Sequence, residues 1–452
     1  MKNRFAAVLL LISIILASLP AIAATESVIA NFNPNAGVSG AYPGAAMIFG
    51  PDGSLYSTAS GGGCGGALHC GTLFQLTPSQ GSFTFTPVYY FCDDQAPPQG
   101  QPCLAGAWPQ AGVITDDAVD SSHSFYTTTL YGGTYDYGIV TKITPPAQGQ
   151  TAWTGAVIYE FTGGVDGGFP LAALIADKSG ALYGTTTVGG INNAGVVFKV
   201  TPPGSGQTQW TETTIWSFAG GASDGSYPVG GLIADKNGAL YGTTYSGGYW
   251  ASGTVFQLVP PGQGQSAWTE NLLWEFLGTT IEGSDGAFPS ATLLMDASGN
   301  LFGTTSAGGQ LLNDGTVFEL SPPTEQNPYW AETILWNFSG KTGALPYGGL
   351  IMDKNGKLYG TTYSGGLAND KQFGGVAFRL NPPTKKKTTW SETVLYKFKG
   401  GNDGAAPYDS LVSDAQGNLY GTTAYGGGTA CQSSYGLGCG TAFELTGTGF
   451  KP

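Results

Sequence analysis

Charged side chains are scarce in this chain, which has 17 Lys and Arg and 30 Asp and Glu among 452 residues. The shortage is greatest for basic residues, so the formal net charge is −13. Nucleic acids and anionic membranes need a basic face on their partner, and the one basic run is residues 385–387, in an expected loop. We therefore expect no nucleic-acid partner.

Good helix formers are also scarce, because Gly and Pro number 74 and 27. These two residues are the poorest helix formers, so the composition excludes a helical bundle and a doubly wound α/β fold and favours many short strands. The 41% hydrophobic content is enough for a packed core and argues against disorder.

The sequence has one long hydrophobic run, residues 5–19. Lys2 and Arg4 precede this run and Ala21-Ile22-Ala23 follows it, which predicts a signal peptide over residues 1–24 and a single domain over residues 25–452. The run is shorter than the roughly 20 residues that span a bilayer, and residues 449–452 add no hydrophobic tail. We expect a secreted protein, periplasmic or extracellular, that is monomeric and has no stable membrane insertion.

Histidine occurs only twice, as His69 and His123, so neither a histidine-rich metal site nor a Ser-His-Asp triad is indicated. We expect no metal and no cofactor. The six cysteines form three local pairs, and in an exported chain this pattern predicts disulfides rather than zinc ligation. The expected pairs are Cys64–Cys70, Cys92–Cys103 and Cys431–Cys439.

An internal repeat fills the rest of the chain. The aromatic residue of a Leu-Tyr-Gly-Thr-Thr block recurs at Tyr56, Tyr126, Tyr183, Tyr241, Phe302, Tyr359 and Tyr420, in steps of 57 to 70 residues. Each copy contains four short strand signals bounded by Gly, Pro, Asp or Asn. Seven copies of four antiparallel strands predict an all-β, seven-bladed propeller.

The count of fourth strands predicts how the ring closes. Six copies end in such a strand, the last at residues 393–398, whereas the seventh copy stops after its third strand at residues 441–445. Residues 27–32 match the missing strand, so we expect them to pair with residues 441–445 and to cover an otherwise bare edge.

The pattern Gly-x-Asp-Gly-x-x-Pro, Asp-x-x-Gly, Leu-Tyr-Gly-Thr-Thr and Gly-Thr-Val-Phe, seen from Gly163 to Leu445, resembles the GloVer tandem repeats of exported bacterial proteins. The resemblance implies an exported repeat protein and no established activity. Gly-x-x-Pro occurs in all seven copies; we expect its Gly to adopt a positive φ and its Pro to begin the innermost strand.

Carboxylates that recur in most copies are predicted to be structural. They include the Asp of the Asp-x-x-G turns and the series Glu212, Glu270, Glu332 and Glu392. A partial ring of Asp166, Asp224, Asp285 and Asp403 favours turn capping, with a cation or hydroxyl ligand as the alternative.

The candidate site consists of residues outside the repeat. All three cysteine pairs map to the face that carries the fourth-to-first and second-to-third connections. The aromatic and acidic residues expected on that face are Trp108, Asp93, Asp94, Tyr135, Asp136, Tyr137, Tyr249 and Trp250. Such residues suit a sugar face and its hydroxyls. We favour a non-catalytic module that binds extracellular glycan or protein; the alternative is a glycoside hydrolase or lyase that uses Asp93, Asp94 and Asp136.

Overall fold

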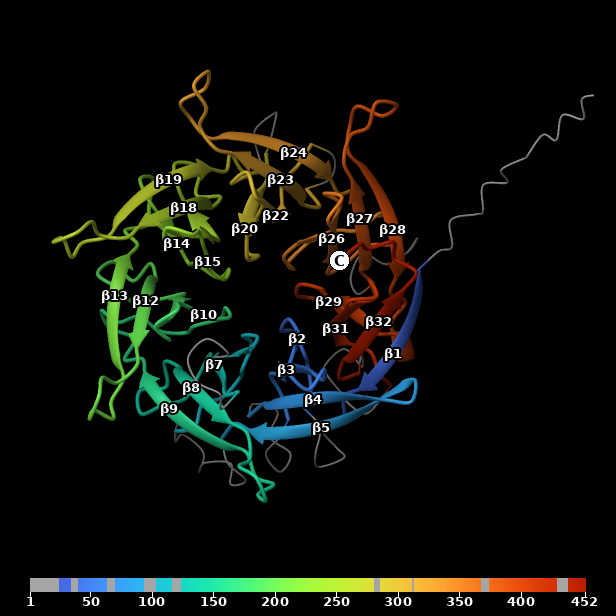
Figure 1. The fold of residues 1–452 in the computed structure, drawn as a ribbon. Helices are drawn as coiled ribbons and strands as arrows, with labels where there is room; N and C mark the ends of the chain where they lie inside the picture. Colours follow the sequence, from blue (N-terminus) through green and yellow to red (C-terminus); the bar gives the residue numbers. More distant parts are fainter. Residues whose placement is uncertain are drawn as a thin grey trace, which may run out of the picture.

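The strands of the computed structural model form seven four-stranded antiparallel blades around a central axis (Figure 1). The predicted seven-bladed propeller is therefore confirmed. The structure describes residues 24–33, 40–62, 70–92, 103–115, 123–279, 285–310, 313–366, 374–428 and 438–452.

Each blade runs from a short strand near the axis to a longer strand at the rim. The first strands are β2 (Ile48–Phe49), β6 (Ile114–Thr115), β10 (Ile175–Ala176), β15 (Ile233–Ala234), β21 (Leu294–Met295), β25 (Ile351–Met352) and β30 (Val412–Ser413). The second strands are β3 (Leu55–Ala59), β7 (Phe125–Thr129), β11 (Leu182–Thr186), β16 (Leu240–Thr244), β22 (Leu301–Ala307), β26 (Leu358–Thr362) and β31 (Leu419–Tyr425).

The outer half of each blade is more regular. The third strands are β4 (Thr72–Ser79), β8 (Ile139–Thr144), β12 (Val196–Thr201), β18 (Thr254–Val259), β23 (Thr316–Ser321), β27 (Val376–Asn381) and β32 (Thr441–Thr446). The fourth strands are β5 (Ser82–Tyr90), β9 (Thr154–Glu160), β13 (Thr211–Ser217), β19 (Thr269–Glu275), β24 (Ala331–Asn337), β28 (Ser391–Lys397) and β1 (Thr25–Asn31).

Short additional elements occur in some blades. They are β14 (Gly225–Ser226) paired with β17 (Ser246–Gly247), β20 (Ala287–Pro289) on β22, β29 (Ala405–Pro407) on β31, and the 3-10 turn η2 (Gly401–Asp403). Within the described ranges, no helix has the length and apolar character needed to cross a membrane.

Strand β1 closes the ring as predicted. It pairs antiparallel with β32, from Thr25 opposite Thr446 to Asn31 opposite Thr441. Phe32 follows β1, is fully buried, and donates its N–H to the Gly440 carbonyl at 3.1 Å. The last blade thus combines the two ends of the described chain, which lie side by side in Figure 1.

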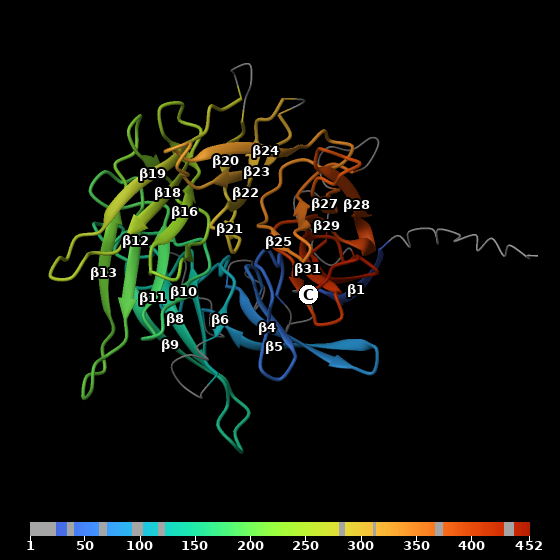
Figure 2. The same cartoon turned by 45° about the horizontal axis from the view of Figure 1, so that its top comes forward.

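The hydrophobic core is divided among the seven interfaces between blades. Each of seven buried clusters combines residues of two neighbouring copies, including the pair joined by closure. The Phe that follows each fourth strand is buried in every copy, at Phe32, Phe91, Phe161, Phe218, Phe276, Phe338 and Phe398. Figure 2 shows the blades packed face to face around the ring.

The Asp-x-x-Gly segments form the expected hairpin turns. In the third copy the N–H of Gly180 donates to the Asp177 carbonyl at 3.0 Å, and the Asp177 carboxylate accepts the N–H groups of Ser179 and Ala181. The same carboxylate accepts the Tyr183 hydroxyl at 3.0 Å, so the turn also fixes the repeat tyrosine. These aspartates are structural, as predicted.

The Gly-x-x-Pro segments connect neighbouring blades. In all seven copies the residue before Pro has a left-handed φ of 56° to 59°, and its N–H donates to a carbonyl of the preceding blade at 2.7–3.2 Å. The seven residues are Tyr42, Trp108, Phe169, Tyr227, Phe288, Leu345 and Ala406. The sequence did not reveal this conformation, because none of these residues is glycine.

The predicted role of the Gly in this segment holds in five copies. Gly40 and Gly225 do not adopt a positive φ; a Cβ at Gly225 would lie 2.4 Å from the Thr244 side chain, so close approach explains that glycine. The Pro ring packs on the Gly that precedes the third strand of the neighbouring blade. A Cβ there would come within 2.3–2.8 Å of the ring in all seven interfaces.

Candidate functional site

A cavity lies on the ring axis because the innermost segments carry small residues. The second residue after the Pro of Gly-x-x-Pro is Ala or Gly in six copies. Its carbonyl accepts a threonine hydroxyl from the second strand of the preceding blade, at 2.8–3.5 Å around the whole ring. This closed set of seven hydrogen bonds fixes the distance between the blades and leaves a space of about 410 Å³ at the axis, which we call the axial cavity.

The wall of the axial cavity is asymmetric. The sixth, seventh and first copies are neighbours through closure, and they contribute five tyrosines, Tyr42, Tyr347, Tyr363, Tyr408 and Tyr425. The second to fifth copies contribute smaller groups, among them Gln110, Leu171, Val229 and Ser290. Seven similar copies therefore build a cavity with one aromatic side.

The tyrosines of this wall contact one another. The rings of Tyr347 and Tyr408 stack at 5.3 Å, and that of Tyr363 lies 5.4 Å from Tyr347 and 6.1 Å from Tyr408. Burial, with the proximity of Tyr347, Asp409 and Tyr245, raises the pKa of Tyr408 to about 12. The Tyr408 hydroxyl therefore keeps its proton at neutral pH and can donate a hydrogen bond.

Asp409 is the acidic residue of the cavity. It occupies the position that is Ala or Gly in the other six copies. Its carboxylate accepts the N–H of Ala46 at 2.8 Å, across the closure interface, and the N–H of Ser410 at 2.6 Å. Burial raises the pKa of the Asp409 carboxyl, and these two N–H groups oppose the rise because they stabilise the ionised form.

Three further sets of contacting aromatic rings are Tyr42 with Tyr425, which also line the axial cavity, then Trp108, Tyr131, Phe169 and Tyr137, and finally Tyr245 with Phe288. We call these sets together the aromatic collar. Its ring pairs have centroids 4.9–6.1 Å apart, and its members are Tyr42, Trp108, Tyr131, Tyr137, Tyr245, Phe169, Phe288 and Tyr425. Most members precede the Pro of Gly-x-x-Pro or lie just after the second strand. The collar thus follows from the repeat, while its aromatic character is particular to some copies.

The structure brings two of the predicted binding residues, Trp108 and Tyr137, into the aromatic collar. Tyr135 lies beside them in the chain and is 56% exposed, but it is not one of the collar ring contacts. Tyr249 and Trp250 form an exposed edge-to-face pair at 5.0 Å in the fourth copy, outside the residues that line the axial cavity. Asp93 and Asp94 lie outside the described residues.

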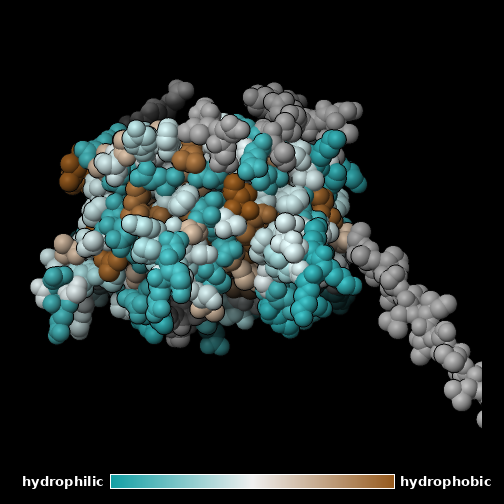
Figure 3. All heavy atoms as spheres, turned by 90° about the horizontal axis from the view of Figure 1, so that it is seen from above, coloured by the Kyte–Doolittle hydropathy of each residue, from teal (hydrophilic) through white to brown (hydrophobic). Residues whose placement is uncertain are grey.

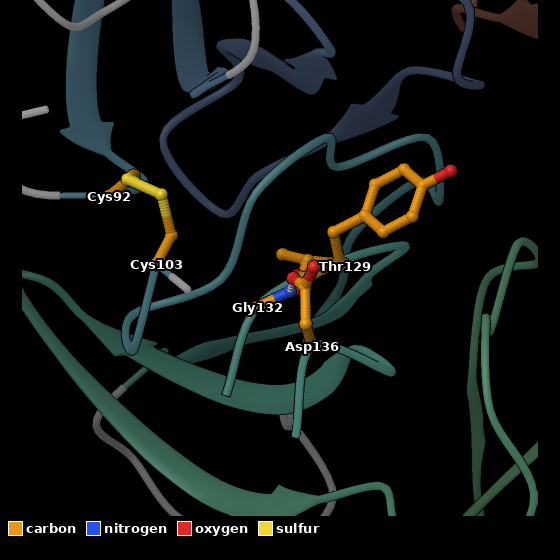
Figure 4. The surroundings of a disulfide bond; sticks show 6 residues. Cys92, Cys103, Thr129, Gly132 and Asp136 are labelled. Atoms are coloured by element: carbon orange, nitrogen blue, oxygen red, sulfur yellow. Dashed lines mark hydrogen bonds between the residues drawn. A yellow bond between two sulfur atoms is a disulfide. The ribbon is translucent and has the colours of Figure 1, made fainter. Parts of the chain in front are cut away.

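Asp136 supports its own loop. Its φ is 59°, and its carboxylate accepts the N–H of Gly132 at 2.9 Å (Figure 4). Asn193 accepts the Gly189 N–H in the same way in the third copy. This shared contact identifies Asp136 as a loop-forming residue of the repeat, which weakens its candidacy as a catalytic acid.

The Cys92–Cys103 disulfide is present as predicted and lies beside the loop that contains Asp136 (Figure 4). Cys70 and Cys439 are also disulfide-bonded. Their expected partners, Cys64 and Cys431, lie outside the described residues, so those two pairings stay predictions.

The partial ring of aspartates caps the ends of the fourth strands. Each carboxylate accepts the N–H of the residue after the buried Phe, at 2.6–2.8 Å: Thr162 to Asp166, Ala219 to Asp224, Leu277 to Asp285 and Lys399 to Asp403. Across the described part of the chain, no three His, Cys, Asp or Glu side chains gather as a metal site requires. The geometry supports the turn-capping interpretation.

These aspartates also face the repeated glutamates of the fourth strands. Burial, followed by the proximity of Asp224, raises the pKa of Glu270 to about 8. Burial and the proximity of Asp285 do the same for the pKa of Glu332. Two carboxyl groups thus share a partly buried interface, a pattern that repeats from blade to blade and is separate from the axial cavity.

The fold and the axial cavity define a seven-bladed propeller with one aromatic-walled site on its axis. The chain belongs to the Gloeobacter/Verrucomicrobia repeat family, whose model matches residues 101–279 and 269–435. This assignment confirms the family that the repeat pattern indicated.

Solved structures with a similar fold include a putative 6-phosphogluconolactonase from Bacteroides uniformis, at 12% identity and a TM-score of 0.43, covering 81% of this chain and 88% of that one. A putative oxidoreductase (glucose dehydrogenase) from Thermus thermophilus has 14% identity and a TM-score of 0.40, covering 93% and 99%. A gluconolactonase from Xanthomonas campestris has 12% identity and a TM-score of 0.37, covering 74% and 88%. A search of curated proteins found no match.

Proposed function

We propose that this protein is an exported, non-catalytic binding module that recognises extracellular glycan through its aromatic collar. The observation that carries the proposal is the collar itself, in which aromatic side chains of several copies form three contacting sets, one of which also lines the axial cavity. Tyr and Trp rings stack on the apolar faces of sugars, while their polar atoms reach hydroxyl groups.

Export is supported by three independent features. They are the hydrophobic N-terminal run, which lies outside the described residues, the disulfide between Cys92 and Cys103, and the resemblance to repeats of exported bacterial proteins. Disulfides persist in oxidising compartments and are rare in the cytosol.

The non-catalytic part of the proposal is supported by the loop role of Asp136, the acidic residue beside the collar residue Tyr137, and by the composition of the axial cavity. A two-carboxylate mechanism needs a second acidic group about 5–10 Å from the first. Asp409 is the one acidic side chain among the described residues that line the axial cavity. The side of the ring that Figure 3 shows carries small, separated apolar patches among hydrophilic side chains.

A glycan array combined with an assay for newly released reducing ends tests the proposal. We expect binding without release, and binding that is weaker by about tenfold in Trp108→Ala and Tyr245→Ala, because each loses one stacking ring. Tyr249→Ala is the matched control, since it removes an exposed tyrosine outside the collar. Reducing-end release that the collar variants abolish would instead identify a carbohydrate-active enzyme, and an array without any bound glycan would refute the proposed ligand.

A further inference from the structure

We propose that the axial cavity binds a small organic cation, specifically an alkylammonium head group. The axial cavity shares Tyr42 and Tyr425 with the aromatic collar, but the inference rests on Asp409 and the Tyr347, Tyr363 and Tyr408 wall and goes beyond the proposed function. It depends on one carboxylate, on five tyrosines and on the charge of the residues around them.

The Asp409 carboxylate makes the cavity negatively charged. Among the described residues that line the cavity, Asp409 is the one charged side chain, and none is Lys, Arg or His. Its hydrogen-bond donors are the N–H groups of Ala46 and Ser410 and the Ser410 hydroxyl, which are neutral groups and stabilise the anion without cancelling its charge. A bound ammonium would supply the missing positive charge. The net charge of −13 on the whole chain also favours the approach of a cation.

The tyrosines favour an organic cation over a metal ion as the ligand. A quaternary ammonium is bound best by several aromatic rings within about 6 Å of the charge, as in aromatic cages. The cavity offers Tyr347, Tyr363 and Tyr408 as one contiguous group, and Tyr42 with Tyr425, 6.1 Å apart, as a second. A metal ion would find one carboxylate among these residues, whereas an alkylated ammonium contacts both the rings and Asp409.

Other ligand chemistries fit the cavity less well. A phosphate or carboxylate ligand would meet the Asp409 charge without any basic side chain among the described lining residues. A neutral polyol can accept hydrogen bonds from tyrosine hydroxyls, but it leaves the carboxylate without a counter-charge.

The departure from the repeat supports a specific role for this wall. The residue after the Pro of Gly-x-x-Pro is Tyr in the sixth and seventh copies, at Tyr347 and Tyr408, and Gly, Gln, Leu, Val or Ser in the others. Asp409 replaces a residue that is Ala or Gly elsewhere. The two kinds of departure coincide in one sector of the ring, where both groups reach the same cavity.

The test compares choline with its neutral isostere 3,3-dimethylbutan-1-ol by titration calorimetry on the full chain. The two probes have the same shape, so a difference in affinity isolates the positive charge. We expect choline to bind at least about tenfold more tightly, because a desolvated cation gains from both the rings and the carboxylate. Asp409→Asn should remove most of this preference and should leave the affinity for the isostere nearly unchanged.

Variants of one tyrosine separate the ring from the hydroxyl. Tyr408→Phe should keep choline binding, and Tyr408→Leu should weaken it several-fold, because only the first retains the aromatic face. Both variants keep a large apolar side chain at position 408, so both are expected to fold, and a thermal melt checks this. Asn at position 409 retains an oxygen that can accept the Ala46 N–H.

Three results would overturn the inference: equal affinity for choline and the isostere, an equal effect of Asp409→Asn on both probes, or glucose that binds in the cavity while choline does not. The array variant Trp108→Ala leaves the residues that line the axial cavity unchanged, so a failed choline titration and a failed array are separate outcomes. Tyr249→Leu is the control that should leave choline affinity unchanged.

Discussion

Removal of the Phe32 side chain tests the closure of the ring. Phe32 is fully buried and lies edge-on to Phe74 and Phe85, with ring centroids 5.0 and 5.3 Å away. It belongs to the closing strand segment but packs on the first blade, so its side chain contributes to the interface that closure creates. Phe32→Ala should lower the free energy of unfolding by about 3–5 kcal/mol, the usual cost of deleting a buried Phe side chain.

The matched control is the equivalent phenylalanine of an interior blade. Phe218 is equally buried, and its ring lies 5.1 Å from Phe256. If closure is equivalent to the other interfaces, Phe218→Ala should cost the same amount. Ile191→Ala, at a residue 81% exposed, should change stability by less than about 0.5 kcal/mol.

Equilibrium urea unfolding followed by intrinsic fluorescence measures all three variants. Deletion of residues 25–33 should cost more than Phe32→Ala, because it also exposes the edge of β32. The reasoning is refuted if Phe32→Ala behaves like the Ile191 variant while Phe218→Ala loses the full amount.

Three further predictions follow from the blade interfaces and disulfides. Gly253→Ala should destabilise the protein by about 2–4 kcal/mol, because its Cβ would lie 2.6 Å from Pro289 Cδ. The control is Gly206→Ala, which has a similar φ and open space around it and should cost only the backbone strain of about 1–2 kcal/mol. Thermal melts compare the two variants. The free energy of unfolding should fall as pH rises from 5 to 8.5. The pKa values of Glu270 and Glu332 are raised to about 8 in the folded protein, so folding favours their protonated forms. The stability that this protonation contributes is complete below the unfolded pKa near 4.5 and is lost as the pH rises through 8. Glu332→Gln should remove about 1–2 kcal/mol of that pH dependence after solvent screening, measured by urea unfolding at both pH values. Peptide mapping without reduction should find the two remaining local disulfides, and a long-range pair or a free thiol would contradict them.

The fold could be predicted from the sequence because the same strand, turn and core motifs recur in copy after copy. The buried Phe after the fourth strand, the Asp-x-x-Gly turn and the paired strand signals each appear in copy after copy, so an ambiguous segment is interpreted by its equivalents. Closure followed from counting these segments. The left-handed residue before each Pro was missed because its conformation is held by a hydrogen bond to the preceding blade, which no local sequence pattern reports.

The candidate site was predicted only in part, for a related reason. Trp108 and Tyr137 were chosen from the sequence as aromatic residues near the cysteine pairs, and the structure places both in the aromatic collar. The axial cavity takes one or two residues from each copy, and these are far apart in the sequence until the ring brings them together. A signal was nevertheless present in the sequence, because Asp409 stands at a repeat position that is Ala or Gly in the other six copies. Asp136 and Asn193 stand at the same place after a Gly-Gly pair, and the hydrogen bond that each accepts from the first of these glycines gives both a role in the loop.

The seven equivalent interfaces imply that the position of the chain break is interchangeable. Thr25 and Thr446 are paired neighbours, so a short loop that joined β32 to β1 would make the last blade a continuous hairpin like the others. New ends could then be opened at the hairpin tip around Gly206, where a side chain would meet nothing within 4 Å. Such a circularly permuted chain should fold to the same ring, since exposed loop tips tolerate new termini. The permuted chain would also have its ends far from Asp409. Ligand binding in the axial cavity could then be measured independently of the strand pairing that closes the ring.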